Sequence, residues 1–401
     1  MDLSVLGQYK QLLPYFFWAF AISFLLSPIV GMLAKNFGIV DLPAKLRTAT
    51  DRSIHKVLHD RIVPKSGGLA IVPSFLIVIA LFLPSQLHML SGIMIGVSII
   101  FIVGILDDKF DLSGKTQLLG HFLAALAFVL SGSSFSQIGG ELFPQINLSL
   151  YTLDLFQIGD TMLKLNLPSD LITIAWIMIV INAIAWIDAL DGLQTGVCII
   201  IASTIAVVSL ASGNYIVTVL CIIFIGSLLG FLPFNFLPGK AFNGTSGSHV
   251  FGYILAILAI LGDTKSASSI LVLMIPLLDM LWVLVGRIHR NQEVNPFKLL
   301  AISDKTHLHH RFLSLGLSKF QVIITEYLFI GIFAIITIAS TGSNRITLLL
   351  LVAFLGIAFL LTVSIILRVK SRKEKKKLLE KKPDEPSSPS ENISPERKYA
   401  Y

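Results

Sequence analysis

The stretch from Leu171 to Phe236 reads LITIAWIMIVINAIAWIDALDGLQTGVCIIIASTIAVVSLASGNYIVTVLCIIFIGSLLGFLPFNF. Its only charged side chains are Asp188 and Asp191. A helix needs about 20 mostly apolar residues to cross a bilayer, so the stretch predicts consecutive membrane-spanning helices joined by short turns. The apolar runs within it are Leu171–Ile187, Leu193–Ala211 and Tyr215–Phe236.

The rest of the chain repeats this pattern. Of the 401 residues, 54% are hydrophobic and only 14% are charged, whereas soluble proteins carry about 25% charged residues. This deficit excludes a soluble enzyme, a disordered chain and a coiled coil, and predicts an all-α, polytopic integral membrane helix bundle of 10–11 transmembrane helices within residues 1–367. The other predicted spans are Leu12–Ala34, Leu69–Leu83, Leu90–Leu106, Leu118–Leu130, His249–Leu261, Ser268–Val285, Gln321–Ser340 and Ile346–Leu367.

The basic residues predict the orientation in the membrane. With eleven spans, alternate loops share a side, and one set of loops carries 27 of the 31 Lys and Arg residues. Positive loops stay in the cytoplasm, so the N-terminus is expected outside and the C-terminus inside, in the cytoplasmic (inner) membrane. The tail 368–401 holds 11 of these basic residues, is then Pro/Ser-rich, and is expected to be disordered. Because the basic residues do not spread over a folded face, no nucleic-acid partner is expected.

One external loop is long. The segment 131–170 has alternating polar and apolar residues and is expected to hold a short hairpin or a helix at the membrane interface.

Acidic residues mark two of the predicted cytoplasmic loops. Asp107 and Asp108 are adjacent at the end of one span, and Asp188 and Asp191 have the i, i+3 spacing that would put them on one face of a helix. Carboxylates at the edge of a membrane bundle are costly and usually mark a site. Paired carboxylates suit Mg²⁺, with Mn²⁺ as the other candidate, and Mg²⁺ typically bridges substrate phosphates.

Two further loops carry groups that suit phosphates. The segment Gly244–Ser248 is a small-residue loop entering a span, and its backbone N–H groups predict an anion-binding nest; an ordinary turn is the alternative. The run His307-Leu-His309-His310-Arg311 can bind a diphosphate or a metal, or form a basic patch. Together, the four loops predict phosphoryl transfer between a soluble nucleotide compound and a lipid phosphate at the membrane surface.

Other functions fit the same residues less well. Asp107-Asp108-x-x-Asp111 has the spacing of a prenyl-diphosphate site, but a prenyltransferase does not require the histidine loop. A transporter would place its ionisable groups near mid-bilayer. Asp279 and Glu326 do lie within predicted spans, and we interpret them as polar groups in helix packing rather than as pathway residues.

In this order along the chain, the motifs resemble the bacterial polyprenyl-phosphate N-acetylhexosamine-1-phosphate transferases, which include the phospho-MurNAc-pentapeptide translocase and the undecaprenyl-phosphate GlcNAc-1-phosphate transferases. The resemblance covers roughly Asp41–Leu317. The matching segments are Asp41-Leu-Pro43, His59…Pro64-Lys-Ser-Gly67-Gly68, Gly104-Ile-Leu-Asp107-Asp108 with Lys115, Asn182…Asp188-Ala-Leu-Asp191-Gly192-Leu193, Gly230-Phe-Leu-Pro-Phe-Asn235-Phe-Leu-Pro238, Gly244-Thr-Ser-Gly247-Ser248 and His307-Leu-His309-His310.

The resemblance implies a reaction and a set of site residues. A lipid phosphate attacks the β-phosphorus of a UDP-N-acetylamino sugar and UMP leaves, which starts a cell-envelope polysaccharide such as a wall polymer, lipopolysaccharide or capsule. The form of the histidine motif favours GlcNAc, and a homodimer is compatible. The implied catalytic residues are Asp107, Asp108 and Asp191, and the implied metal ligands are Asp107, Asp108, Asp188 and Asp191. The implied substrate-binding residues are Lys115, Asn182, Asp188, Gly244, Gly247, Ser248, His307, His309, His310 and Arg311.

Three positions depart from the family pattern. Ala185 replaces the second Asn, Ala189 replaces a Gly, and Thr245 replaces an Asp. In relatives, the replaced Asn and Asp resemble Mg²⁺ ligands, and neither Ala185 nor Thr245 offers an anionic oxygen. A catalytically degenerate protein that binds lipid phosphate or a partner without turnover is therefore the alternative to an active enzyme.

Overall fold

The computed structural model describes residues 3–43, 46, 61–135, 137–138, 146–158, 161–262, 267–291, 306–339, 351, 354–367 and 369–370. Apart from residues 369 and 370, the predicted tail 368–401 lies outside these residues, and so does His59. The longer helices of the described part are α1 (Leu3–Asn36), α2 (Gly67–Phe82), α3 (Leu87–Phe110), α4 (Gly114–Leu130), α5 (Ser169–Ala185), α6 (Leu193–Ala211), α7 (Tyr215–Asn235), α8 (Gly244–Gly262), α9 (Ala267–Asn291), α12 (Lys319–Ala339) and Phe354–Leu367. The short ones are η3 (Pro84–Gln86) and α11 (Leu308–Leu315).

The predicted all-helical membrane bundle is confirmed. In the described part of the chain, seven helices are long and apolar enough to cross a membrane, and four shorter apolar helices match the remaining predicted spans. The predicted span His249–Leu261 is short, but α8 begins five residues earlier, at Gly244. The polar segment Gly-Thr-Ser-Gly-Ser therefore belongs to the first turn of the helix rather than to a loop.

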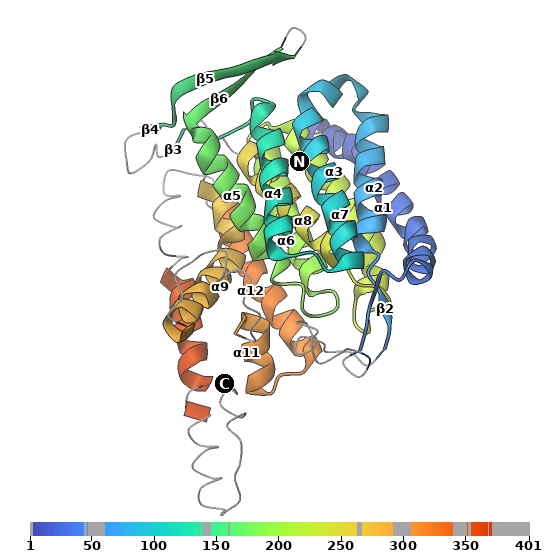
Figure 1. Ribbon diagram of the computed structural model, residues 1–401, viewed down its shortest axis with the longest axis vertical. Helices are drawn as coiled ribbons and strands as arrows, with labels where there is room; N and C mark the ends of the chain where they lie inside the picture. The colour runs from blue at the N-terminus through green and yellow to red at the C-terminus, as the bar shows by residue number, and fades with distance from the viewer. Residues whose placement is uncertain are drawn as a thin grey trace, which may run out of the picture.

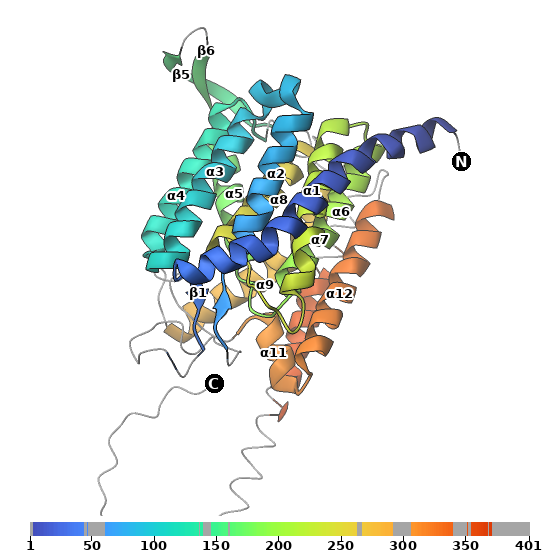
Figure 2. The ribbon, with the colours of Figure 1, turned by 90° about the vertical axis from the view of Figure 1, so that its right-hand side faces the viewer.

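Helix α8 lies at the centre of the bundle and packs against α2, α3, α5 and α6. Its large side chains Phe251 and Tyr253 are fully buried, as are Phe224 and Phe231 of α7. Helix α1 crosses the outside of the bundle obliquely (Figure 2) and packs against α2 and α7. Its outward face keeps apolar residues such as Phe17 and Leu25 exposed, as expected for a surface that contacts lipid.

The two ends of the bundle differ (Figure 1). One end carries the antiparallel hairpin β5 (Ser149–Ile158) and β6 (Thr161–Pro168), with the short pair β3 (Gln137–Ile138) and β4 (Ile146–Asn147) nearby. The hairpin expected in the loop 131–170 is thus present. The opposite end, called the site end below, carries α11, the ribbon of β1 (Val40–Asp41) and β2 (Val63–Pro64), and the loops after α3, α5 and α7.

Candidate active site

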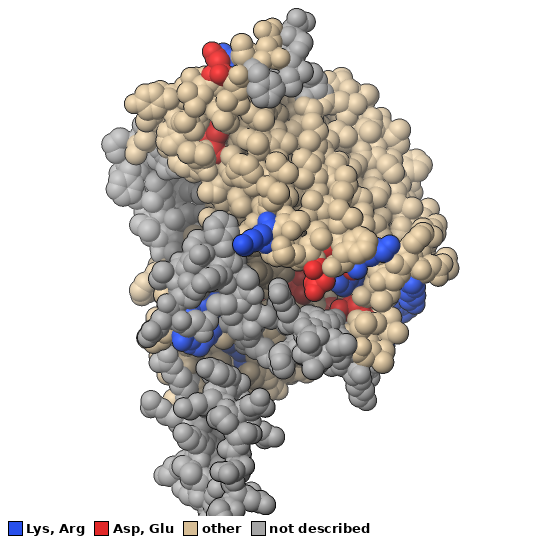
Figure 3. Space-filling view, viewed as in Figure 1, with Lys and Arg blue, Asp and Glu red and all other residues tan. Residues whose placement is uncertain are grey.

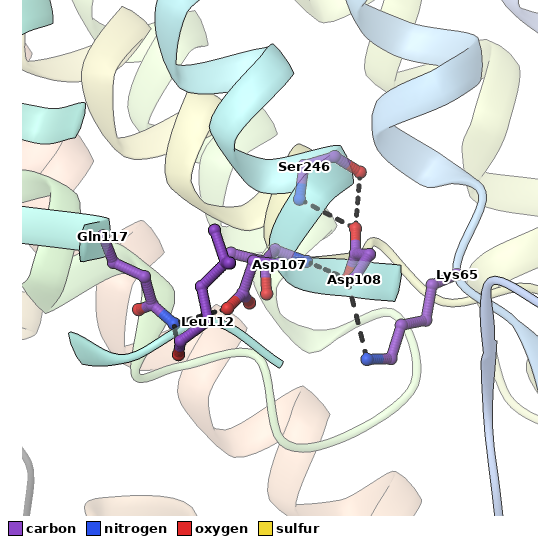
Figure 4. Close-up of polar contacts among 7 residues, drawn as sticks. Lys65, Asp107, Asp108, Leu112, Gln117 and Ser246 are labelled. Carbon is purple, nitrogen blue, oxygen red and sulfur yellow. Dashed lines mark hydrogen bonds and ion pairs between the residues drawn. The ribbon is translucent and has the colours of Figure 1, made fainter. Parts of the chain in front are cut away.

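Asp108 stands in the last turn of α3 and binds the first turn of α8. Its Oδ1 accepts a hydrogen bond from the backbone N–H of Thr245 (2.8 Å), and its Oδ2 accepts from the N–H (3.0 Å) and Oγ (2.7 Å) of Ser246 (Figure 4). The Nζ of Lys65 lies 3.7 Å from Oδ1. The buried carboxylate thus satisfies N–H groups that the start of a helix leaves unpaired, and the helix dipole favours its charge there.

Gly244 permits this contact. Its φ of +70° is a left-handed conformation that L side chains rarely adopt, and a Cβ built on it would lie 2.5 Å from Asp108 Oδ2. The backbone N–H groups of this segment do bind an anion, but it is the Asp108 carboxylate of the same chain and not a phosphate. Gly247 and Ser248 follow, buried, in the same helix. The substrate-binding roles of these three residues stay predictions.

Asp107, the neighbour of Asp108, turns toward α4. Its Oδ1 accepts a hydrogen bond of 2.7 Å from Gln117 Nε2, which also lies 3.4 Å from the carbonyl oxygen of Leu112 (Figure 4). Lys115, predicted to bind substrate, lies exposed in the first turn of α4. Both residues are at the site end, since α3 ends and α4 begins there.

Asp188 and Asp191 lie in the short turn between α5 and α6. Asp188 is exposed, and its Oδ1 accepts a hydrogen bond from Asn243 Nδ2 (3.0 Å); Asp191 Oδ2 accepts from the N–H of Gly239 (2.8 Å). Water reaches Asp188, but the surrounding protein removes enough hydration to raise its pKa to about 7. The hydrogen bond from Asn243 opposes this rise, and the charges of Asp108, Asp191 and Asp41 add to it.

Asn243, which directly precedes α8, connects the start of that helix to the turn of Asp188, and no motif in the sequence pointed to it. Its Nδ2 donates to Asp188 Oδ1 and to Gln194 Oε1 (2.8 Å), and its Oδ1 lies 3.1 Å from Thr195 Oγ1. Thr195 Oγ1 also lies 2.7 Å from Asn235 Oδ1. In the sequence, this hydrogen-bond network was indicated by Gln194 and Thr195, two polar residues at the start of an otherwise apolar run.

The histidine cluster lies at the start of α11. His307 Nδ1 is 2.9 Å from Asp279 Oδ2, and its ring centroid is 5.7 Å from that of His309, which is 4.4 Å from that of His310. All three histidines are buried. Arg311 is buried too; its Nε donates to the carbonyl of Thr306 (2.6 Å) and its Nη1 to Ser364 Oγ (3.2 Å). These contacts hold the loop, and the substrate roles of these residues stay predictions.

Trp186 joins the histidine cluster to the acidic turn. Its ring meets that of His307 edge to face at 5.2 Å, and it lies two residues before Asp188. Asn182, one turn earlier in α5, donates to the carbonyl of Met178 (2.7 Å). A continuous path of contacts therefore runs from Asp108 through the start of α8 and Asn243 to Asp188, and through Trp186 to His307. Figure 3 shows acidic and basic side chains gathered in a belt toward this end of the surface.

The donor set fits a metal that is shared with substrate better than a closed cage. In the residues that the structure describes, no three His, Cys, Asp or Glu side chains are grouped to hold a metal ion. Both oxygens of Asp108 already accept hydrogen bonds, whereas Asp188 is accessible and accepts one, from Asn243. Mg²⁺ usually takes one or two carboxylates together with substrate phosphates, and Asp188 suits that arrangement. The full set of four aspartates stays a prediction.

A polytopic helix bundle with carboxylates and imidazoles converging at one end defines a membrane-embedded enzyme of the phosphoryl-transfer class. Residues 90–263 match the model of glycosyl transferase family 4. The chain is 34% identical to the probable undecaprenyl-phosphate N-acetylglucosaminyl 1-phosphate transferase of Bacillus subtilis, over 85% of this chain and 89% of the relative.

Two further relatives carry names of the same kind of transferase. The decaprenyl-phosphate N-acetylglucosaminephosphotransferase of Mycobacterium leprae is 29% identical over 78% of this chain and 79% of its own. The phospho-N-acetylmuramoyl-pentapeptide-transferase of Staphylococcus aureus is 27% identical over 65% of this chain and 79% of its own. The chain belongs to the family of polyprenyl-phosphate N-acetylhexosamine-1-phosphate transferases, as its motifs predicted.

Proposed function

We propose that the protein transfers an N-acetylamino-sugar 1-phosphate from a UDP-sugar to a polyprenyl phosphate. An oxygen of the lipid phosphate bonds to the β-phosphorus, the bond from that phosphorus to the bridging oxygen breaks, and UMP leaves with that oxygen. The product is a lipid-diphosphate sugar that begins a cell-envelope polysaccharide. The observation that carries the proposal is the path of contacts that joins Asp108, Asp188 and His307 at one end of a membrane bundle.

The chain's own residues have distinct tasks in this proposal. Asp188 is the accessible carboxylate for a Mg²⁺ (or Mn²⁺) that accompanies the diphosphate, and the bound cation would neutralise charge on the phosphates. The histidine cluster supports the diphosphate. Asp108 and Lys65 fix the start of α8 next to Asp188. Asp107 is the candidate base, since it lies at the same end and is held by Gln117.

The site end is proposed to face the cytoplasm at the inner membrane. The split of 27 basic residues against 4 between the two sides supports this orientation, and nucleotide sugars are water-soluble. Two of the three relatives above carry N-acetylglucosamine in their names, which favours UDP-GlcNAc as the donor. A homodimer stays a prediction.

The direct test uses the purified full-length protein with undecaprenyl phosphate, Mg²⁺ and a panel of UDP-sugars. We expect UMP release that depends on both the lipid phosphate and the cation, and is fastest with UDP-GlcNAc. If no sugar gives UMP while the double variant Ala185→Asn with Thr245→Asp does, the degenerate alternative is correct. Position 245 lies in the first turn of α8, and its N–H bonds the Asp108 carboxylate, so a carboxylate added there would stand beside Asp108 and favour a cation between the two.

Cation affinity is expected to fall as the pH is lowered. The pKa of Asp188 is about 7 without metal, so the carboxylate is ionised above pH 7 and takes up a proton below it. Because a proton and Mg²⁺ compete for the same oxygens, apparent affinity weakens by up to about tenfold per pH unit below pH 7. Titration calorimetry with Mg²⁺ at pH 6 and pH 8 measures this change. Asp188→Asn should remove the difference, and equal wild-type affinity at both values contradicts the prediction.

A further inference from the structure

Both carboxylate oxygens of Asp279 contact the start of α11, which carries the histidines. It lies on α9 within a membrane-spanning segment and is buried, with 7% of its surface exposed. Its Oδ2 is 2.9 Å from His307 Nδ1, and its Oδ1 accepts a hydrogen bond of 2.9 Å from the N–H of Leu308, the first residue of α11. A carboxylate in a membrane segment is expensive, so a contact that uses both oxygens on one loop points to a task there.

This placement makes the sequence-based interpretation of Asp279 as a polar group in helix packing more specific. In the described residues, its hydrogen bonds run to the start of α11 and not to a neighbouring membrane helix. The sequence could not show this, because 28 residues separate Asp279 from His307. Glu326, given the same interpretation, is buried on α12, and its Oε1 has no hydrogen-bond partner among the residues that the structure describes.

The contact with Asp279 gives the two ring nitrogens of His307 different roles. When the Asp279 carboxylate is the acceptor of this hydrogen bond, Nδ1 of His307 is the donor and carries the proton. Nε2 is then left to accept a hydrogen bond, or to donate one when the ring is protonated. A fixed tautomer and ring orientation are what such an acidic partner supplies to a functional histidine.

Helix α9 holds the same ring from a second side through Trp186. Arg287, two turns beyond Asp279 on α9, places its Cζ 4.6 Å from the centre of the Trp186 ring. Trp186 in turn meets His307 edge to face at 5.2 Å. The imidazole is therefore clamped between Asp279 and a tryptophan that belongs to the turn of Asp188.

We infer that Asp279 is a positioning residue that orients His307, with Nε2 directed to the diphosphate of the nucleotide sugar; this inference rests on the function proposed above. Asp279 touches no substrate in this scheme and acts through His307. It is an addition to the residues that the motifs predicted, since it lies in an apolar helix outside all of them.

The first experiment compares wild type with Asp279→Asn in steady-state UMP release. Asparagine can still accept from the Leu308 N–H, but its amide offers His307 Nδ1 a donor instead of an acceptor and so reverses the tautomer. We expect kcat/KM for the UDP-sugar to fall by about 10- to 100-fold, while KM for polyprenyl phosphate is unchanged. The inference is overturned if kcat/KM for the UDP-sugar does not fall, or if the affinities for the UDP-sugar and for polyprenyl phosphate fall equally. Asp279→Glu keeps the carboxylate and should be more active than Asp279→Asn. It is also the variant to compare with wild type if Asp279→Asn does not fold.

The second experiment asks whether Asp279 acts through His307. On a His307→Ala background, Asp279→Asn should change kcat/KM by no more than about twofold, because the group that it orients is absent. A further tenfold loss on that background shows a general structural role and contradicts the inference. Asp170→Asn is the matched control, since it changes another buried carboxyl group, at the opposite, hairpin end of the bundle, and it should keep wild-type kcat/KM.

A binding measurement separates this inference from the proposed function. Calorimetry with UDP and Mg²⁺ needs no turnover, and UDP affinity should fall in Asp279→Asn and stay unchanged in Asp170→Asn. Wild type that binds UDP without releasing UMP refutes the proposed turnover alone. Wild type that releases UMP, with an Asp279→Asn variant of equal activity and UDP affinity, refutes the positioning role alone.

Discussion

Replacing Asp188 with asparagine is expected to lower UMP release by at least about 100-fold, with the fold intact. The substitution keeps the shape of the side chain and its acceptor for Asn243, but removes the negative charge. A cation in a phosphoryl-transfer site supplies several kcal/mol of charge stabilisation, and about 1.4 kcal/mol corresponds to tenfold in rate. Since Asp188 is exposed and makes this single hydrogen bond, thermal unfolding should change little. Initial rates of UMP release and a melting curve in detergent measure both.

Asp111→Asn is the matched control for this prediction. Asp111 lies four residues after Asp107 at the same end, is exposed, and ends α3 with a φ of +51°, which asparagine tolerates. Its activity should stay within about twofold of wild type. If Asp111→Asn abolishes activity and Asp188→Asn does not, the prenyl-diphosphate spacing Asp107-Asp108-x-x-Asp111 defines the site instead.

Replacing Gly104 with alanine is expected to damage both stability and turnover. A Cβ there would lie 2.4 Å from the Cα and 2.7 Å from the backbone nitrogen of Ser246, so α3 and α8 must move apart. Overpacking of this kind costs about 1–3 kcal/mol of stability. The same movement breaks the contact between Asp108 and the start of α8, and a displacement of about 1 Å in a site can cost 100-fold in rate. Reversible unfolding in detergent and UMP release test the two effects.

Gly331→Ala separates this effect from the general effect of a glycine in a helix. Gly331 lies within α12, and a Cβ added there would meet open space. Alanine should therefore raise stability slightly, by about 0.5–1 kcal/mol, and leave turnover unchanged. Two variants with equal losses would mean that the contact between α3 and α8 is not what matters at Gly104.

Much of the architecture followed from hydropathy, because apolar runs of sufficient length have few alternatives in a bilayer. The placement of the four polar loops at one end of the bundle also followed from the order of the spans, since alternate loops of a chain that crosses a membrane lie on the same side. The start of α8 did not, because Gly244–Ser248 reads as a turn in the sequence, and the carboxylate that bonds its N–H groups comes from another helix.

The contacts that determine the site were harder to predict because they join residues far apart in sequence. Asn243 reaches Asp188 over 55 residues, and Lys65 lies beside Asp108. Asp279 was visible as an unusual charge in an apolar helix, but its partner was not. A polar residue in a span signals that a partner exists, while its identity depends on the packing of helices.

The double-aspartate motif at the end of α3 has a mechanical consequence. Successive residues on a helix point about 100° apart, so the two neighbouring carboxylates reach different partners. Asp107 is bonded to Gln117 of α4 and Asp108 to Ser246 of α8. These two contacts restrain the rotation of α3 about its own axis. A ligand that pulled either carboxylate out of its present contact would also loosen the packing of α3 on the helix that holds it.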